Sequence, residues 1–187
     1  RDFPLNHELE TQVIHHRNTI ENILSGKDDR LLVITGPCSI HDPVAALEYA
    51  QKLYELQKQI SDEIFLVMRA YIEKPRTTVG WKGYMYDPNL DGSSDLQLGL
   101  KKSRELYLKI IESGLPIASE ILSPMATGYF DDLLVWGAIG ARTSESQIHR
   151  EISSHMPFSI GFKNGTDGSI QIALDAIQSA TNPHQFM

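Results

Sequence analysis

Residues 116–140, PIASEILSPMATGYFDDLLVWGAIG, hold two short apolar runs, at 116–122 and 135–140, on either side of a helix-length segment at 125–134. Both runs have the length of a strand, and strands that are apolar on both faces are typical of parallel sheets. Parallel strands need a long crossover connection, usually a helix. This stretch therefore predicts a β–α–β unit.

The same alternation continues on both sides of this unit. Further strand-sized apolar runs lie at 31–34, 64–68, 158–162 and 185–187, and segments with helical patterns lie at 7–24, 43–56, 100–113, 144–154 and 169–180. Asp42-Pro43 predicts a helix start, because Asp is a favoured N-cap and Pro suits the first helical position. Gly114 and Pro116 predict the end of the segment at 100–113. The sequence thus predicts five repeated βα units, the start of a sixth strand and a helix before them.

Two α/β architectures fit this order, an open doubly wound sheet and a (β/α)8 barrel. An open sheet would usually carry a glycine-rich phosphate loop after its first strand, and GPCSIHDP at 36–43 is not one. We therefore predict a (β/α)8 TIM barrel, with a helical extension over residues 1–26 and about five and a half βα units over 27–187. The chain starts at Arg1 and stops at an apolar HQFM, so we expect a fragment of a longer barrel.

Composition excludes several classes of protein. The 187 residues include 24 acidic and 17 basic side chains, which give a net charge of −7, and a single cysteine. An acidic chain argues against a nucleic-acid partner, because such proteins neutralise phosphates with an excess of Lys and Arg. One cysteine excludes an intrachain disulfide, and no apolar stretch approaches the 18 residues of a membrane span. We expect a soluble cytoplasmic protein without a membrane segment.

Basic residues gather where the predicted strands end. Six of the 17 cations lie at or just beyond the carboxyl ends of strands: Arg69, Lys74, Arg76, Lys82, Arg142 and Lys163. In a parallel α/β fold these ends face one side, where ligands bind. Any one cation alone could pair with a structural carboxylate or extend from the rim. As a set they predict a site for a small anion with a carboxylate or phosphate group.

Two further residues belong to the same predicted edge. Cys38 follows the first strand beside Gly36 and Pro37; a lone cysteine is often just a small buried side chain, but this position favours a thiolate or metal ligand. Glu120 ends a buried strand, where an unpaired carboxylate would be costly. It forms a structural ion pair with Arg69 or Arg142, or it orients those side chains or a water molecule, and both readings stay open.

Four motifs resemble one known family. GPCSIHDP at 36–43, MRAYIEKPRTTVGWKG at 68–83, WGAIGARTSESQIHRE at 136–151 and GFKNGTDGS at 161–169 are similar to segments of the class I microbial 3-deoxy-D-arabino-heptulosonate 7-phosphate (DAHP) synthases. The resemblance covers essentially the whole chain. It implies a (β/α)8 barrel that condenses phosphoenolpyruvate with D-erythrose 4-phosphate and releases phosphate, the first step of aromatic amino-acid synthesis.

The resemblance also implies roles for individual residues. Cys38 corresponds to a ligand of an essential divalent metal ion, which could be Mn, Fe, Co or Zn. Phosphoenolpyruvate would be bound by Arg69, Lys74, Arg142 and Lys163, with Lys74 and Glu120 as catalytic residues. Erythrose 4-phosphate would be bound by Pro75, Arg76, Thr77 and Thr78. Family members are usually homodimers or homotetramers, so residues 1–26 are a candidate subunit contact, and an aromatic amino acid is a candidate feedback inhibitor.

One departure from the family pattern limits what this chain is expected to do alone. The family's other metal ligands, a His, a Glu and an Asp, lie on later strands, so we expect these 187 residues to be inactive by themselves. One alternative is a non-catalytic module that binds anions or senses aromatic amino acids. Another is a related phosphosugar enzyme, such as the synthase of the eight-carbon homologue, which the KPRTTVGWKG match at 74–83 disfavours.

Overall fold

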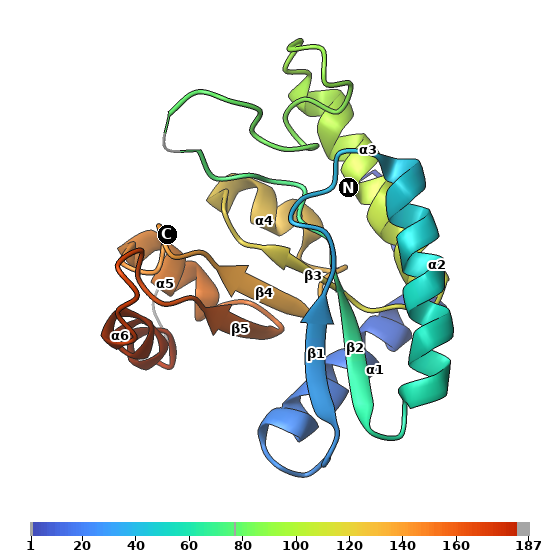
Figure 1. Ribbon diagram of the computed structural model, residues 1–187, viewed down its shortest axis with the longest axis vertical. Coiled ribbons are helices and arrows are strands. Elements are labelled where there is room, and N and C mark those ends of the chain that lie inside the picture. Colours follow the sequence, from blue (N-terminus) through green and yellow to red (C-terminus); the bar gives the residue numbers. More distant parts are fainter. Residues whose placement is uncertain (1, 77, 183–187) are drawn as a thin grey trace.

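The computed structural model describes residues 2–76 and 78–182, and its centre is one sheet of five parallel strands (Figure 1). The strands are β1 Leu31–Thr35, β2 Ile64–Arg69, β3 Ile117–Glu120, β4 Trp136–Ile139 and β5 Ser159–Phe162. Each strand pairs with the next one along the chain, in the order β1-β2-β3-β4-β5. A doubly wound sheet would reverse its order at a switch point. The sheet curls instead into half of a barrel, which confirms the predicted partial (β/α)8 fold.

Six helices accompany the strands in the described residues. They are α1 His7–Leu24, α2 Pro43–Ile60, α3 Leu96–Glu112, α4 Pro124–Phe130, α5 Gln147–Ser153 and α6 Gln171–Ala180. Asp42 caps α2 as predicted, since its carboxylate accepts the backbone N–H groups of Val44 and Ala45. Asp95 caps α3 in the same way, so that helix begins four residues earlier than predicted. The apolar run predicted at 185–187 lies outside the described residues.

The core fills the space between the sheet and the helices around it. Val67 and Met68 of β2, Ile117 of β3 and Tyr107 of α3 are fully buried. The Tyr107 hydroxyl donates to Ala70 O at 2.5 Å, so the ring is buried with its polar group satisfied. None of the helices in the described residues is long and apolar enough to cross a membrane.

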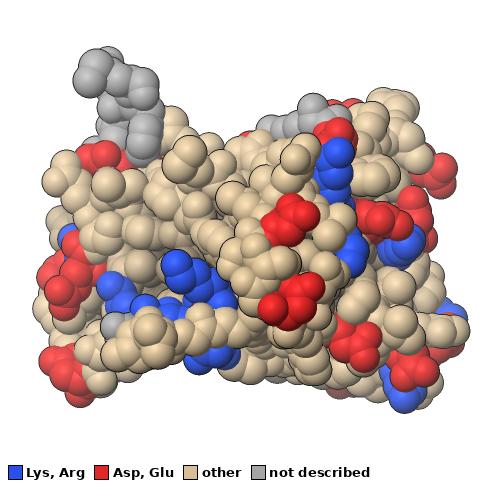
Figure 2. All heavy atoms as spheres, turned by 90° about the horizontal axis from the view of Figure 1, so that it is seen from above, with Lys and Arg blue, Asp and Glu red and all other residues tan. Residues whose placement is uncertain are grey.

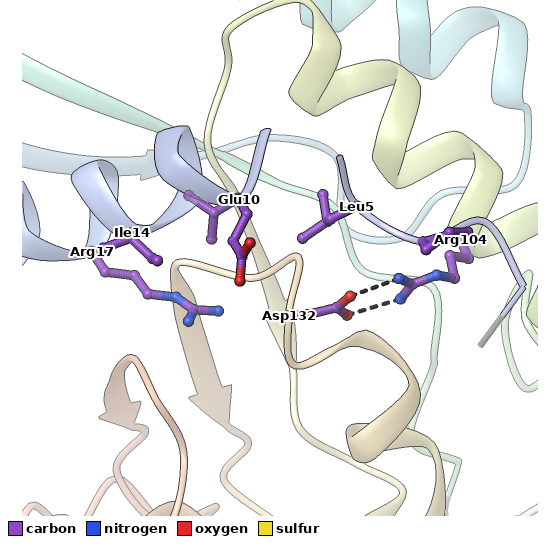
Figure 3. Close-up of a pocket in the computed structure, with 8 residues that line it drawn as sticks. Leu5, Glu10, Ile14, Arg17, Arg104 and Asp132 are labelled. Carbon is purple, nitrogen blue, oxygen red and sulfur yellow. Dashed lines mark hydrogen bonds and ion pairs between the residues drawn. The ribbon is translucent and has the colours of Figure 1, made fainter. Parts of the chain in front are cut away.

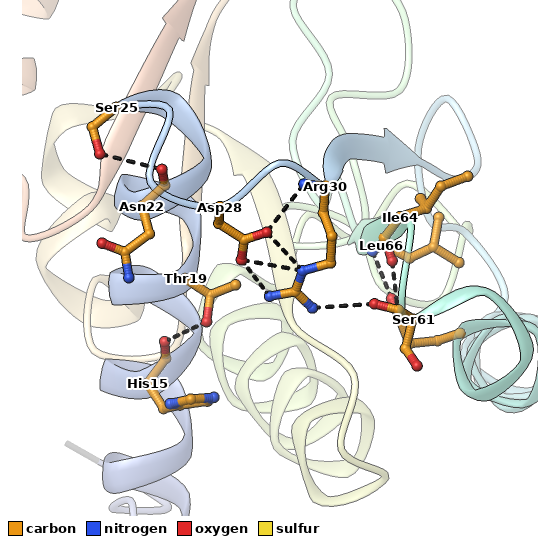
Figure 4. A network of polar contacts seen from close by, with 10 residues as sticks. His15, Thr19, Asn22, Ser25, Asp28, Arg30, Ser61, Ile64 and Leu66 are labelled. Atoms are coloured by element: carbon orange, nitrogen blue, oxygen red, sulfur yellow. Dashed lines mark hydrogen bonds and ion pairs between the residues drawn. The ribbon is translucent and has the colours of Figure 1, made fainter.

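Helix α1 packs across the amino ends of the strands, on the side away from their carboxyl ends. Arg17 donates to Leu134 O and Asp131 O, just before β4, and lies over the Phe158 ring just before β5. On the same side Arg30, just before β1, binds the Asp28 carboxylate and donates to Ser61 O, which links the approaches to β1 and β2 (Figure 4). Hydrogen bonds to backbone carbonyls therefore hold α1 and the segment before β1 at the amino ends of the strands.

A buried arginine, Arg104, holds the segment that precedes α1. The Arg104 side chain is 0% exposed, and its guanidinium forms a two-point ion pair with Asp132 at 2.6 and 2.9 Å (Figure 3). It also donates to the backbone carbonyls of Asp2, Phe3 and Tyr129. A cavity of about 430 Å³ lies between this pair and α1. Arg104 thereby joins the segment before α1 to α3 and α4.

His16 on α1 should make stability depend on pH. Its ring packs against Phe65, and burial together with the neighbouring His15 lowers its pKa to about 4. Because the native state favours the neutral ring, the stability it contributes is full above pH 6.5 and is lost as the pH falls toward 4. Between pH 7 and pH 4 the parent protein should lose up to about 3 kcal/mol of unfolding free energy that the His16→Leu variant retains. Urea unfolding at both pH values measures this difference. The exposed His7→Leu variant is the control and should follow the parent protein.

Candidate functional site

A cavity of about 290 Å³ lies at the carboxyl ends of the strands, and its wall is formed by the end of β3 and by residues at or after the ends of the other four strands. Its lining residues are Cys38 after β1; Arg69, Tyr71, Glu73, Lys74, Pro75 and Arg76 of β2 and its connection; Glu120 of β3; Gly140, Ala141, Arg142 and Thr143 after β4; and Lys163 after β5. Seen from above, Lys and Arg side chains gather in a hollow of this face (Figure 2). Parallel strands bring their carboxyl ends to one side of the sheet, and this explains the convergence.

The structure therefore brings most of the predicted site residues to one cavity. Arg69, Lys74, Pro75, Arg76, Glu120, Arg142, Lys163 and Cys38 all line it. Thr78 is exposed and does not line it, and Thr77 lies outside the described residues. Lys82 lines a separate cavity within the connection from β2 to α3. Lys82 is accordingly not part of the predicted cluster of cations.

Cys38 and Lys74 form a direct pair. The Lys74 Nζ donates to Cys38 Sγ at 2.6 Å, and Arg69 donates to the Cys38 carbonyl at 3.0 Å. The hydrogen bond from Lys74, with the charges of Lys74, Arg69 and Lys163, lowers the pKa of the Cys38 thiol. Cys38 is exposed, so the interpretation as a merely buried small side chain is wrong. It is a solvent-facing thiol whose anionic form is stabilised.

Arg69 is held by its neighbours on two sides. Its guanidinium carbon lies 4.1 Å from the centre of the Tyr71 ring, and the same ring has Lys163 Nζ 5.7 Å from its centre. Tyr71 is 5% exposed, and its pKa is raised to about 12 because the ring is buried. A neutral aromatic ring attracts both cations. Arg69 thus reaches the cavity with a fixed orientation.

Glu120 sits among the cations at the end of β3. It is 7% exposed, and burial raises the pKa of its carboxyl, while Lys163, Arg69, Arg142 and Lys74 oppose that rise. Gly140 makes room for it, because a methyl group at Gly140 would lie 2.3 Å from Glu120 Oε1. The carboxyl is consequently a group that can hold or release a proton beside four positive charges.

The loops that carry Arg142 and Lys163 are tied together. Ser144 Oγ lies 2.8 Å from Lys163 O and 3.1 Å from Gly140 O, and Ser144 is fully buried. Because its hydroxyl joins the two loops, residues 141–145 form turns, and α5 begins at Gln147. The helix predicted at 144–154 was wrong in its first turn for this reason.

Five lining residues were not among the predicted site residues: Tyr71, Glu73, Gly140, Ala141 and Thr143. Arg69, Tyr71 and Glu73 alternate with the buried residues Ala70 and Ile72. Such alternation places every second side chain on the same face of an extended segment. The alternation is readable in the sequence, but it lies beyond the apolar run that predicts β2.

The pairing of Cys38 with Lys74 predicts a reactive thiol. Lys74→Met should slow alkylation of Cys38 by iodoacetamide at pH 7 by about fivefold, because the thiolate loses its principal stabilising partner. Cys38 is the single cysteine, so mass spectrometry can follow the reaction without ambiguity. Lys82→Met, which removes a cation of the same connection outside this cavity, should leave the rate unchanged. An equal rate in Lys74→Met and the parent protein would contradict the pairing.

The donor set at the cavity is that of an incomplete metal site. Cys38 supplies one soft donor, and residues 2–76 and 78–182 hold no group of three or more His, Cys, Asp and Glu side chains arranged to bind a metal ion. Selective divalent sites usually have three or more protein ligands. The described residues therefore supply one candidate ligand of such a site, Cys38.

Comparisons with known proteins agree with the geometry. The model of the DAHP synthetase I family matches residues 7–187. The Tyr-sensitive and Phe-sensitive phospho-2-dehydro-3-deoxyheptonate aldolases of Escherichia coli K12 are 52% and 54% identical to this chain over 185 residues, or 99% of it. The structure of a phospho-2-dehydro-3-deoxyheptonate aldolase from Francisella tularensis SCHU S4 is 51% identical, has a TM-score of 0.96 and covers 99% of this chain.

These proteins are longer than the chain. It spans 52% and 53% of the two Escherichia coli relatives and 54% of the Francisella tularensis chain, so about half the length of the proteins it matches. The match nevertheless extends from α1 to the end of the described residues, and it includes every loop that lines the cavity. The chain belongs to the DAHP synthetase I family.

Proposed function

We propose that the protein to which these residues belong condenses phosphoenolpyruvate with D-erythrose 4-phosphate. One water is consumed, and the products are 3-deoxy-D-arabino-heptulosonate 7-phosphate and inorganic phosphate. The observation that carries this proposal is the convergence of Arg69, Lys74, Arg142 and Lys163 on one cavity in a chain of net charge −7. Phosphoenolpyruvate carries a carboxylate and a phosphate, so it needs several fixed cations. The relatives named as phospho-2-dehydro-3-deoxyheptonate aldolases support the same reaction.

The geometry suggests a role for each group. Arg69, fixed by Tyr71, and the loop cations Arg142 and Lys163 bind the two anionic ends of phosphoenolpyruvate. Fixed positive charges also stabilise the negative charge that develops as phosphate leaves. Lys74 and Glu120 line the same cavity as these cations. We assign proton exchange with the bound substrate to these two side chains, and the raised pKa of the Glu120 carboxyl suits that role.

The segment after Lys74 is proposed to bind the second substrate. Pro75 and Arg76 line the cavity at its rim, and Arg76 Nε donates to Trp81 O at 2.8 Å, which folds the segment back on itself. We assign the phosphate of erythrose 4-phosphate to this rim, with Thr77 and Thr78 as further contacts. Arg76 is exposed, so its guanidinium is available to an incoming phosphate.

Cys38 is proposed as one ligand of a divalent metal ion in the whole protein, with the other ligands from outside these 187 residues. When bound, such an ion would polarise the aldehyde of the second substrate. The anionic tendency of the Cys38 thiol suits a metal ligand. In the full-length protein, Cys38→Ser should lower metal content measured by mass spectrometry while leaving phosphoenolpyruvate binding within about threefold. Unchanged metal content would contradict the assignment.

The assembly and its regulation are likewise proposals. We propose a cytoplasmic homodimer or homotetramer in which residues 1–26 contact a neighbouring subunit. The relatives' names, Tyr-sensitive and Phe-sensitive, support feedback control by an aromatic amino acid. Light scattering of the full-length protein with and without residues 1–26 tests the first point. A protein that stays equally oligomeric without this segment would contradict it.

Binding of phosphoenolpyruvate is the direct test of the cavity. Arg142→Ala and Lys163→Ala should each weaken binding about tenfold by calorimetry, because each removes one charged contact to the ligand. Lys101→Ala, on the exposed face of α3, is the control and should bind like the parent protein. Tight binding by both cavity variants would contradict the proposed site. Binding without phosphate release in the full-length protein, when both substrates are present, would favour a non-catalytic module.

A further inference from the structure

Two buried acidic residues of the anion pocket also line a second, smaller cavity. Glu73 is 6% exposed and Glu120 is 7% exposed, and both line a space of about 10 Å³. Tyr107, Ser119 and Thr127 add polar groups to its wall. This volume is at the lower end of what one water molecule occupies, and a buried water needs two to four polar partners. The space thus has the size and the lining of a single-water site between two carboxyl groups.

Glu73 is held in place by contacts from two connections. Its Oε1 accepts the Tyr86 hydroxyl at 3.2 Å, and its Oε2 accepts the backbone N–H of Ser123 at 3.3 Å. On either side the backbone is paired, because Lys74 N–H donates to Lys82 O and Met85 N–H donates to Ile72 O. The carboxyl group therefore has a fixed position between the β2–α3 and β3–α4 connections.

The two carboxyl groups differ in the charges around them. Glu120 faces Lys163, Arg69, Arg142 and Lys74. Glu73 accepts the hydroxyl of Tyr86 and shares the small cavity with Tyr107 of α3 and Glu120 of β3, and α4 contributes no titratable group to this cavity. Burial, together with the charge of Glu120, raises the pKa of Glu73 to about 7. Two carboxyl groups in such proximity titrate as a pair, because the second negative charge is opposed by the first.

We propose that Glu73 and Glu120 share one proton through the water-sized cavity, and that release of this proton to solvent adds a negative charge to the wall of the anion pocket and weakens anion binding there. Glu73 is then a positioning residue that acts through Glu120 and the neighbouring cations. The inference rests on the proposed function of the pocket as an anion site. It adds a control of that site by the charge of a second carboxyl group in its lining.

Sulfate is a suitable probe, because its charge stays constant between pH 6 and 8.5. The Cys38→Ser background removes the titration of the thiol in the same pocket. In that background, sulfate affinity measured by calorimetry should fall about fivefold from pH 6 to pH 8.5 as the pair loses its proton. Glu73→Gln preserves the shape of the side chain but cannot ionise, so its affinity should stay nearly level. Glu112→Gln, on the exposed face of α3, should behave like the background protein.

The outcomes separate this inference from the proposed function. Absence of sulfate binding at every pH would overturn the anion pocket itself. Binding with the same pH dependence in Glu73→Gln and in the background would overturn the proton-sharing pair alone. A role of Glu73 in packing only would change affinity equally at all pH values, and that result would also overturn the pair.

Thermal unfolding gives a second measurement that does not depend on any ligand. A carboxyl whose native pKa is raised favours the neutral form. The stability that Glu73 contributes is therefore full at low pH and is lost as the pH rises through 7. Glu73→Gln should therefore melt about 5 °C above the parent protein at pH 8, with the difference shrinking toward pH 4.5. Identical melting temperatures across this range would overturn the raised proton affinity on which the pair depends.

Discussion

Replacing Arg104 by alanine should lower the free energy of unfolding by about 4 kcal/mol, because it removes a buried guanidinium that pairs with Asp132 and donates to several backbone carbonyls. The guanidinium is 0% exposed and bonds Asp132 at two points, so removal also opens a cavity in the wall between α3 and α4. The segment around Asp2 and Phe3 should detach first. Urea unfolding followed by circular dichroism measures the first effect, and hydrogen exchange of residues 2–6 measures the second.

Arg30→Ala is the matched control, since it removes a similar two-point pair at a different depth. Arg30 and Asp28 are 28% and 22% exposed, and partly exposed pairs contribute about 1 kcal/mol or less. We therefore expect the parent protein to be the most stable, Arg30→Ala to be slightly less stable, and Arg104→Ala to be clearly the least stable. Equal losses in the two variants would show that burial of Arg104 adds nothing to its pairing.

Replacing Arg69 by methionine should weaken phosphoenolpyruvate binding about 100-fold. Hydrogen bonds to charged groups contribute about 1.5–3 kcal/mol, and Arg69 is oriented in advance by the Cys38 carbonyl and the Tyr71 ring. Arg142 and Lys163 lie on exposed loops, so the loss should exceed the tenfold effect expected for either of them. Calorimetry with phosphoenolpyruvate gives the comparison directly.

The same variant carries an internal check on its fold and electrostatics. Methionine replaces the unbranched, apolar part of the arginine side chain, so the stability of Arg69→Met should stay within about 1 kcal/mol of the parent protein. The pKa of the Cys38 thiol should rise, because Arg69 is one of the cations that lower it. A folded variant whose affinity stays within threefold of the parent would remove Arg69 from the binding site.

The strands and most helices could be predicted from the sequence because their signals are local. The runs at 31–34 and 64–68 lie within β1 and β2, and Asp42 and Pro43 mark the start of α2 through a contact two residues away. The helix at 7–24 agrees with the structure at both ends. Apolar periodicity and capping act over a single turn or strand, so one sequence contains them in full.

The features that could not be predicted depend on partners distant in the chain. Ser144 looked like a helix start, yet its hydroxyl bonds the carbonyl of Lys163, nineteen residues later. Glu73 gives no local sign that it meets Ser123 and Glu120 across two connections. Convergence of the cations was predictable because the fold places every strand end on one side, whereas the individual contacts follow from loop conformations that no local pattern specifies.

The hydrogen bond between Ser144 and the Lys163 carbonyl should make the pocket select anions by their length. Because the loops after β4 and β5 are joined by a buried hydroxyl, Arg142 and Lys163 extend from anchors whose separation is fixed. We expect an anion whose charged groups match this separation to contact Arg142 and Lys163 at once. A longer or shorter diacid should contact only one of them. Breaking the tie with Ser144→Ala should therefore broaden the range of anions accepted while reducing the preference among them, so selectivity would be lost more than affinity.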